Sequence, residues 1–291
     1  MSKTIKVKMF PSPHRLDNLN NGVGQVVYHY AKYVPRFGVE FVKEGDYEIK
    51  AAHAGITRGD CDVAHLHGLY WGDDLEHWQR ASNAYIVEAC RSAKAITVPS
   101  EWVAETFQRD MRINPYVIPH GIDYEEWETK EGYGGYVLWN KNRMTDVCDP
   151  SAVNYLAAYF SDLQFKTTFA KEPADNIATI GSVPHEVMKP LVEGCAIYLS
   201  TVKETFGIGV LEAMAAGRPV LGWAYGGNAD LVKHGETGYL AKPNDYEDLA
   251  TGLDYCLRHA EVLGDNGREL VKGYSWLRAA EMVAKVYHRV L

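Results

Sequence analysis

The chain has 291 residues, of which 46% are hydrophobic and 23% are charged, and its formal net charge is −8. This composition indicates a globular protein large enough for two domains, and no apolar run approaches the roughly 20 residues that span a bilayer. The acidic balance excludes a general attraction to nucleic acid or anionic lipid, although it leaves room for a local basic cleft.

The N-terminus and the cysteines bear on the compartment. Residues 1–5 contain no apolar signal core, so we expect no export by the ordinary route. The five cysteines are scattered, odd in number and without a Cys-x-x-Cys pair, which argues against a disulfide framework or a structural zinc site. We therefore expect a cytoplasmic protein with reduced thiols.

In the first part of the chain, short strands alternate with amphipathic helices. A strand at residues 5–10 is followed by a loop rich in Gly and Asn at residues 16–24, and the helix after it stops at Pro35. This order is the start of an α/β unit whose loop can approach a ligand closely. Further strands are expected at residues 39–42, 47–51, 61–68, 95–98 and 116–119, and helices at residues 25–34, 83–93 and 101–110, the last with Ser100 as its N-cap.

A charged, aromatic and Gly-rich segment at residues 125–135 has no apolar period, and we place the domain boundary there. Beyond it, strands are expected at residues 136–139, 165–169, 177–180, 196–200, 219–222 and 239–241, and helices at residues 151–160, 185–193, 208–216 and 245–259. The alternation predicts two parallel-sheet α/β domains that face each other. They cover residues 1–127 and 134–274, and residues 275–291 form a closing helix.

The most informative stretch runs from Lys203 to Gly217. Glu204 and Glu212 stand eight positions apart, with a Gly-containing turn between them, and Glu212 lies in an alanine-rich run. This pattern predicts a loop that leads into a helix, with Glu204 before the helix and Glu212 about one turn inside it. A helix N-terminus presents N–H donors and partial positive charge, which suits a phosphate. A nucleotide sugar has the matching shape, with phosphates in its middle and hydroxyl groups at both ends.

This stretch and several shorter motifs resemble the GT-B glycosyltransferases, specifically the retaining family 4 group. The resemblance implies two Rossmann-like domains facing across a cleft, with the first domain reduced and the last helix crossing back to it. It also implies retaining sugar transfer from a nucleoside diphosphate to an acceptor hydroxyl, with neither a metal nor a cofactor. The matching segments are Asn21-Gly22-Val23-Gly24, His65-Leu66-His67-Gly68, Val98-Pro99-Ser100, residues 118–123, residues 203–217, Arg218-Pro219-Val220, Gly226-Gly227 and residues 234–240.

The resemblance assigns the donor site mainly to the second domain. Glu204 would hold hydroxyl groups of the donor sugar, and Glu212 would accept hydrogen bonds from the ribose, since a carboxylate fits a vicinal diol. Ser182 and Val183 lie where the family cradles the base with backbone groups. The full set of expected donor-binding residues is Gly22, Gly24, Arg143, Ser182, Val183, Thr205, Phe206, Gly207, Ile208 and Glu212.

The cations of the diphosphate site depart from the family pattern. Many relatives have a Gly-Arg turn at the start of the second domain and a Lys some residues later. Here Lys141 falls where the Arg is expected, and Asp146 falls where the Lys is expected. We therefore propose that Lys141 and Arg143 share the role, with Lys141 and Glu204 counted as catalytic.

The first domain is also short. Many relatives carry a further strand with a Thr-x-His-type turn, whose His faces the donor sugar, and this sequence has no clear equivalent. His67 or His77 takes that role, and we favour His67 as the third catalytic residue because it ends a strand in a Gly turn. The pair Asp73 and Asp74 suggests a metal, but no strand precedes it and the family requires none, so no metal site is predicted.

Each assignment has a structural alternative. The two glutamates could serve helix-end electrostatics, Lys141 and Arg143 a solvated loop, His67 a turn, and Gly22 with Gly24 only a tight turn. At the level of function, an epimerase or hydrolase on the same fold and a non-catalytic nucleotide-sugar-binding module stay open. Transfer to DNA gains no support from the acidic charge. The sequence names neither base, sugar, acceptor nor oligomeric state.

Overall fold

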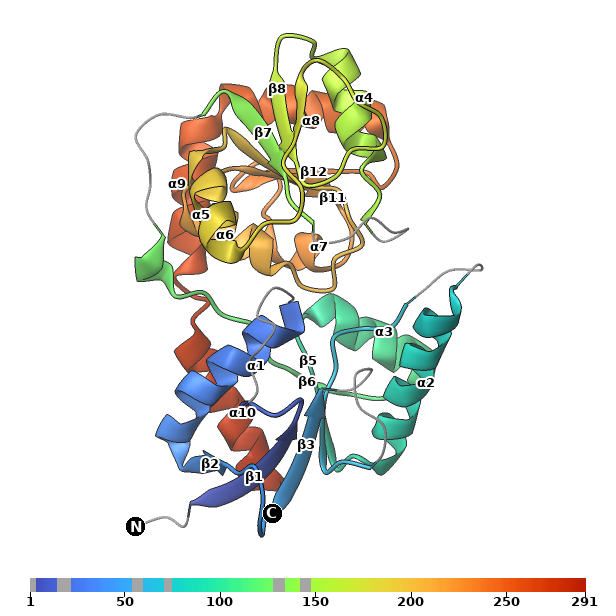
Figure 1. Ribbon diagram of the computed structural model, residues 1–291, viewed down its shortest axis with the longest axis vertical. Helices are drawn as coiled ribbons and strands as arrows, with labels where there is room; N and C mark the ends of the chain where they lie inside the picture. Colours follow the sequence, from blue (N-terminus) through green and yellow to red (C-terminus); the bar gives the residue numbers. More distant parts are fainter. Residues whose placement is uncertain (1–3, 15–21, 54–59, 71–74, 128–133, 142–147) are drawn as a thin grey trace. The chain divides into compact units, whose positions relative to one another are not determined.

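The computed structural model describes residues 4–14, 22–53, 60–70, 75–127, 134–141 and 148–291. The chain divides into two compact units (Figure 1). The first unit combines Met1–Gly121 with Trp276–Leu291, and the second unit is Ile122–Ser275. Among the residues that the structure describes, none of the helices is long and apolar enough to cross a membrane.

The first unit is built on a parallel sheet with the strand order β2-β1-β3-β4-β5-β6. Its strands are β1 (Ile5–Phe10), β2 (Val39–Phe41), β3 (Ile49–His53), β4 (Val63–His65), β5 (Ala95–Val98) and β6 (Tyr116–Val117). Its helices are α1 (Gly22–Tyr33), the 3-10 turn η1 (Val34–Phe37), α2 (His77–Ser92), α3 (Glu101–Met111) and α10 (Trp276–Val290).

Side chains along this sheet alternate between two helical layers, because successive residues of a strand point to opposite faces. Ala52 and Ala64 belong to a hydrophobic cluster that also contains residues of α2 and α3. Their neighbours His53 and His65 lie against rings from α1 and α10. Strand β4 is buried at every residue, as expected of a strand covered on both faces. Strands β1 and β2 instead alternate buried apolar residues with the exposed Lys6 and Glu40.

The second unit is built on a parallel sheet with the order β12-β11-β10-β7-β8-β9. Its strands are β7 (Tyr136–Trp139), β8 (Gln164–Thr167), β9 (Ile177–Thr179), β10 (Ile197–Ser200), β11 (Val220–Trp223) and β12 (Gly238–Ala241). One core cluster packs this sheet against α4 (Ser151–Tyr159) and α8 (Tyr246–Arg258). A second cluster packs it against α5 (His185–Gly194), α6 (Ile208–Ala215), α7 (Gly227–Leu231) and α9 (Ala260–Val271). The expected parallel-sheet α/β class is confirmed in both units.

The structure differs from the sequence prediction at three kinds of place. The first helix begins at Gly22, so Gly22 and Gly24 lie in its first turn and not in the loop before it. Helices α7 and α9 were not predicted; α7 is only 5 residues long, and α9 contains two buried glycines, which weaken the helical pattern. The unit boundary also falls earlier, because Ile122 pairs with Ser275 and Trp127 packs in the core of the second unit.

Candidate active site

The carboxyl edge of the second sheet brings two predicted catalytic residues together. In the order β9-β8-β7-β10-β11-β12, the chain runs outward from β7 in both directions, so the switch point of the topology lies between β7 and β10. Lys141 follows the end of β7, and Glu204 follows the end of β10. Open α/β sheets bind ligands outside the carboxyl ends of strands at such a switch point. The two side chains therefore lie where this fold holds a ligand.

Lys141 and Glu204 form a short ion pair. The distance from Lys141 Nζ to Glu204 Oε1 is 2.7 Å, and the side chains are 10% and 26% exposed. The backbone N–H of Lys141 donates to Thr168 Oγ1 at 2.8 Å, which anchors this end of the loop. Burial acts to lower the pKa of Lys141, but Glu204 and the Tyr198 phenol act against it and raise the pKa above its ordinary value. The ammonium group therefore stays charged at neutral pH.

The residues beneath this ion pair were not predicted. The Tyr198 hydroxyl donates to Asn140 Oδ1 at 2.6 Å, next to Lys141 in the chain. A Cβ atom on Gly209, in the first turn of α6, would lie only 2.3 Å from that hydroxyl. Glycine at this position thus allows β10 and α6 to approach the start of the Lys141 loop. In the sequence, only the Gly-containing turn between Glu204 and Glu212 indicated that elements approach closely here.

The loop from Glu204 to Gly207 is held from below by two glycines. The Gly227 N–H donates to the Glu204 carbonyl oxygen at 3.0 Å. A Cβ atom on Gly226 would lie 1.9 Å from that same oxygen, and one on Gly227 would lie 2.0 Å from the Phe206 carbonyl oxygen. These contacts leave no space for any side chain at either glycine. They fix the backbone that carries Glu204.

Helix α6 begins at this loop without a side-chain cap. Its N-cap residue is Gly207, with φ +105°, a left-handed conformation that glycine adopts at little cost. The helix runs from Ile208 to Ala215, so Glu212 lies just over one turn inside it, as predicted. A helix N-terminus that carries partial positive charge and lacks a side-chain cap is suited to a phosphate.

Glu212 is engaged by a histidine that was not predicted. His185 Nε2 lies 2.9 Å from Glu212 Oε1, with the His185 side chain 47% exposed and that of Glu212 14% exposed. The hydrogen bond to Glu212 raises the pKa of His185, an effect that burial opposes. Two expected base-contacting residues lie just before this histidine: Ser182 is exposed, and Val183 packs partly into the core.

His67 lies in the first unit, within a group of histidines. His67 Nε2 and His53 Nδ1 lie 2.8 Å apart and share one hydrogen bond, and the His120 ring lies 5.8 Å from the His67 ring. Burial lowers the pKa of His67 to about 4, so the ring is neutral at neutral pH. His77, the alternative, is exposed at the first position of α2. Sequence inspection missed His53, although it closes β3 directly opposite His65 on β4.

The other predicted residues divide as follows. Thr205, Phe206, Gly207 and Ile208 form the turn into α6, while Gly22 and Gly24 begin α1 in the first unit. Arg143 and Asp146, together with Asp73 and Asp74, lie outside the described residues. Within the described part of the chain, no group of three or more His, Cys, Asp or Glu side chains is arranged to hold a metal ion.

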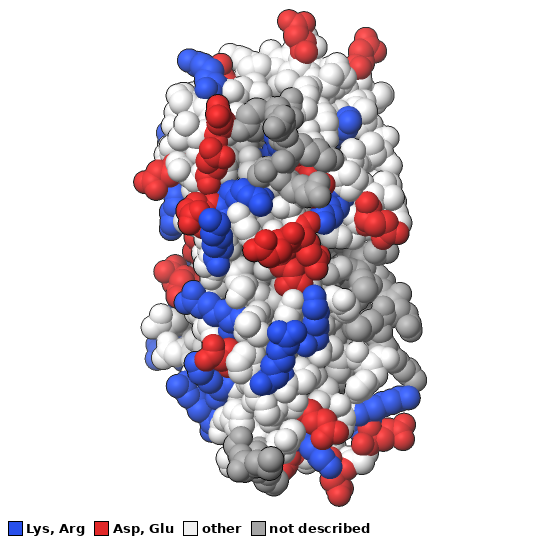
Figure 2. All heavy atoms as spheres, turned by 90° about the vertical axis from the view of Figure 1, so that its left-hand side faces the viewer, with Lys and Arg blue, Asp and Glu red and all other residues white. Residues whose placement is uncertain are grey.

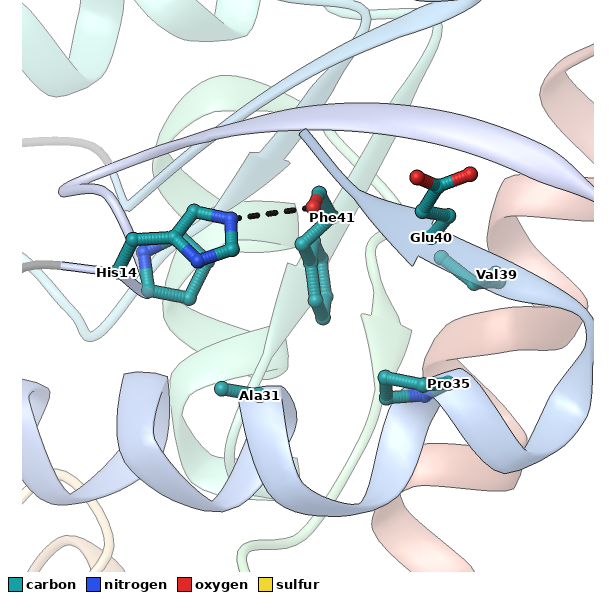
Figure 3. A pocket seen from close by; sticks show the side chains of 7 residues that line it. His14, Ala31, Pro35, Val39, Glu40 and Phe41 are labelled. Carbon is teal, nitrogen blue, oxygen red and sulfur yellow. Dashed lines mark hydrogen bonds between the residues drawn. The ribbon is translucent and has the colours of Figure 1, made fainter. Parts of the chain in front are cut away.

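A cavity of about 300 Å³ lies elsewhere in the first unit, between α1, η1 and β2 (Figure 3). His14 reaches across it, with Nε2 3.1 Å from the Phe41 carbonyl oxygen. None of the predicted site residues lines it. Its lining residues are Pro13, His14, Ala31, Pro35, Val39, Glu40 and Phe41.

Charged side chains of both signs are interspersed over the face shown in Figure 2. Neither sign forms a broad field among the described residues of that face. Nucleic-acid-binding proteins usually present a continuous basic stripe. This face has none in its described part, in keeping with the net charge of −8.

Comparison with known proteins places these features in a family. Residues 165–270 match the family model of glycosyl transferases group 1, and residues 49–126 match that of glycosyltransferase family 4. N-acetyl-alpha-D-glucosaminyl L-malate synthase of Bacillus anthracis is 35% identical over 99 residues, which are 32% of this chain and 26% of that protein. An alpha-1,3/1,6-mannosyltransferase of Neurospora crassa is 34% identical over 116 residues, which are 38% of this chain and 25% of that protein. The chain thus covers about a quarter of the length of these relatives.

Solved structures resemble the chain over nearly its whole length. The Anabaena protein HepE in complex with UDP and glucose superposes with a TM-score of 0.76 at 15% identity, over 98% of this chain and 100% of that one. A glycosyltransferase from Rickettsia africae superposes with a TM-score of 0.70 at 14% identity, over 100% and 99% of the two chains. At these identities the likeness establishes the fold alone. Together with the two family models, it supports a GT-B glycosyltransferase similar to those of family 4.

Proposed function

We propose that the protein transfers a sugar from a nucleoside diphosphate to an acceptor hydroxyl, with retention of anomeric configuration. The observation that carries this proposal is the ion pair between Lys141 and Glu204, 2.7 Å apart at the switch point of the second sheet. A cation for the leaving diphosphate and a carboxylate for the sugar hydroxyls are thereby set beside the N-terminus of α6. A nucleotide sugar requires these three features side by side.

The leaving group needs stabilisation of negative charge. As the bond between the anomeric carbon and the phosphate oxygen breaks, charge grows on the diphosphate. An ammonium group has three donors, of which one is directed at Glu204, and we assign the others of Lys141 to the diphosphate. The N-terminus of α6 at Gly207 and Ile208 supplies further positive potential, and Arg143 shares the role of Lys141. Preorganised electrostatics of this kind is often the largest catalytic term.

The sugar and the acceptor complete the reaction. Glu204 accepts hydrogen bonds from the sugar, Glu212 binds the ribose, and the backbone near Ser182 and Val183 binds the base. The acceptor oxygen attacks the anomeric carbon on the face that the diphosphate leaves, and its proton passes to a diphosphate oxygen. We assign the neutral His67 to a hydrogen bond with the sugar, and the first turn of α1, at Gly22 and Gly24, to the donor. The reaction needs no side-chain nucleophile and, in this proposal, neither a metal nor a cofactor.

Uridine diphosphate sugars are the first donors to test, because the Anabaena neighbour was solved with UDP and glucose. A donor that binds only the folded protein must raise its melting temperature. We therefore expect one member of a panel of nucleotide sugars to raise it. With an acceptor, transfer should yield a product of the donor's anomeric configuration, observable by NMR. A changed sugar nucleotide without acceptor would indicate an epimerase instead, and rapid nucleotide release a hydrolase.

Replacement of Glu204 by alanine tests the site itself. Glu204→Ala should lower the rate of transfer at least ~100-fold, if the carboxylate positions the sugar in the transition state. Lys203→Ala is the matched control, because Lys203 is the exposed neighbour of Glu204 in the same loop. Near wild-type activity of Glu204→Ala would remove Glu204 from the site.

A further inference from the structure

We propose that His185 is a positioning residue for the nucleoside half of the donor, because it ties the base-binding turn to the ribose-binding carboxylate Glu212. This inference rests on the proposed function and adds a residue to it. It begins from two separate elements. The turn at Gly181 to Pro184 follows β9, whereas Glu212 lies on α6, which follows β10. Strands β9 and β10 lie on opposite sides of β7 in the sheet.

The bridge between these elements is a single hydrogen bond. His185, the first residue of α5, brings Nε2 to 2.9 Å from Glu212 Oε1, across 27 positions of the chain. Behind it, α5 and α6 pack through Met188, Val192 and Val210 in one core cluster. The bond therefore adds a polar contact at the end of an apolar interface, where it can set the position of one side chain.

The His185 ring is itself held from the side. The Trp127 ring stands edge-on to it with a centroid distance of 6.0 Å, and Trp127 is 5% exposed. Arg268 Nη1 donates to the Trp127 carbonyl oxygen at 3.1 Å, and Lys189 Nζ lies 5.3 Å from the centre of the Trp127 ring. The ring thus has a fixed wall beside it, although 47% of the His185 side chain stays open to solvent.

This arrangement leaves most of the Glu212 carboxylate for a ligand. A carboxylate offers about four acceptor positions, and His185 occupies one of them on Oε1. A vicinal diol needs two acceptors in a fixed orientation, and a carboxylate already oriented by a donor costs less to order on binding. Since Ser182 and Val183 lie only three and two positions before His185, the same bond also sets the spacing between the base contacts and the ribose contact. The chemical step, carried by Lys141 and Glu204, is separate.

The consequence is an effect on donor binding with little effect on turnover. We expect His185→Ala to weaken the binding of UDP about 3- to 10-fold in calorimetric titration, the loss typical of one partly exposed charge-assisted hydrogen bond. At saturating donor, kcat should stay within about twofold of wild type. His185→Gln should recover part of the affinity, because its amide can still donate to Glu212. Glu186→Gln is the control, since Glu186 is the exposed neighbour of His185 in the first turn of α5.

A double-mutant cycle separates positioning from simple helix stabilisation. If His185 acts through Glu212, adding His185→Ala to Glu212→Gln should weaken UDP binding no further. A purely structural bond would instead lower the melting temperature and leave the affinity unchanged. Wild-type affinity of His185→Ala, or fully additive losses in the cycle, would overturn the inference alone. If the wild-type protein binds none of UDP, GDP and ADP, the proposed function fails, and this inference fails with it.

Discussion

The carboxyl edges of the two sheets both gather basic side chains, but the pKa values of these side chains shift in opposite directions. In the second unit, Lys141 and His185 each lie within 3 Å of a carboxylate oxygen, and both pKa values are raised. In the first unit, burial lowers the pKa of His65 to about 3 and that of His67 to about 4. Burial disfavours charge everywhere, and only a paired carboxylate reverses its effect.

The partners of the histidines explain the difference. His53 shares its hydrogen bond with His67, and His65 bonds Thr97 Oγ1 at 2.7 Å and the Tyr287 hydroxyl at 2.8 Å. None of these four bonding partners is an anion, and neighbouring histidines lower one another's pKa values further. The second unit therefore has an edge suited to an anionic ligand. The first has a neutral hydrogen-bonding edge, of the kind that a sugar or acceptor hydroxyl requires.

Acidification should produce the largest difference in stability between the two units. For His65 and His67 the folded pKa lies below the ordinary value of about 6.5, so their contribution is complete above that pH and is lost as the pH falls toward 4 and 3. Each histidine that stays neutral costs about 1.4 kcal/mol of stability per pH unit in that window. For His185 the folded pKa is raised, so its contribution is present in acid and is lost as the pH rises through that pKa.

Hydrogen exchange read by mass spectrometry, corrected for intrinsic rates, measures this separation. Peptides of β3 and β4 should lose protection below about pH 6 before peptides of β7 and β10 do. Simultaneous loss in both units would contradict the comparison. At every pH at which the His65→Phe variant folds, the protection of these peptides should depend less steeply on pH than in the wild type.

The next largest effect concerns the backbone at the carboxyl edge of the sheet in the second unit. In Gly226→Ala, the new Cβ would lie 1.9 Å from the Glu204 carbonyl oxygen, at a residue with φ +61°. We expect a loss of about 3 kcal/mol or more in stability and weaker donor binding, because the backbone at Gly226 or at Glu204 must move to relieve the clash. Gly135→Ala is the control, since its Cβ would meet nothing within 4 Å. Urea unfolding measures both, and equal stability of the two variants would show that the Glu204 loop tolerates displacement.

A smaller effect tests the hydrogen-bonded edge of the first unit. Tyr287→Phe removes the hydroxyl that lies 2.8 Å from His65 Nε2 and leaves this nitrogen buried without that partner. We expect a loss of about 1–3 kcal/mol. Tyr159→Phe removes a hydroxyl from a side chain in a residue that is 65% exposed and should change little. If both variants unfold at the same urea concentration, the bond between α10 and β4 contributes nothing measurable.

The smallest expected effect compares the helix starts at the two edges. Ser100 caps α3 in the first unit, with its side chain accepting from the Val103 N–H, whereas α6 has Gly207 and no side-chain cap. Ser100→Ala should cost about 1 kcal/mol, and Ser100→Asp should restore the cap. Thermal unfolding followed by circular dichroism tests this. An unchanged melting temperature of Ser100→Ala would mean that the cap at the first edge is dispensable.

Much of the fold followed from local pattern. The strand and helix alternation predicted every strand of both sheets, and Ser100 was correctly predicted as a cap because capping depends on neighbours three residues away. The boundary was placed late because Ile122 and Trp127 join the second unit through contacts with Ser275 and with its core. Helix α7 was missed because a contact distant in sequence stabilises it: the Asn228 side-chain amide donates to the Ser200 carbonyl oxygen.

By itself, the sequence determined the parallel-sheet class and the chemical types at the donor edge: the carboxylates Glu204 and Glu212, the cation Lys141, and a glycine turn before a helix. Only the tertiary structure decided the pairings. Lys141 meets Glu204 across 63 positions, and His185 meets Glu212 across 27. The tertiary structure also decided that His67 is neutral, because burial lowers its pKa and its hydrogen-bond partner is another histidine, His53. Local periodicity reports which face of an element is buried, but not which distant side chain meets it there.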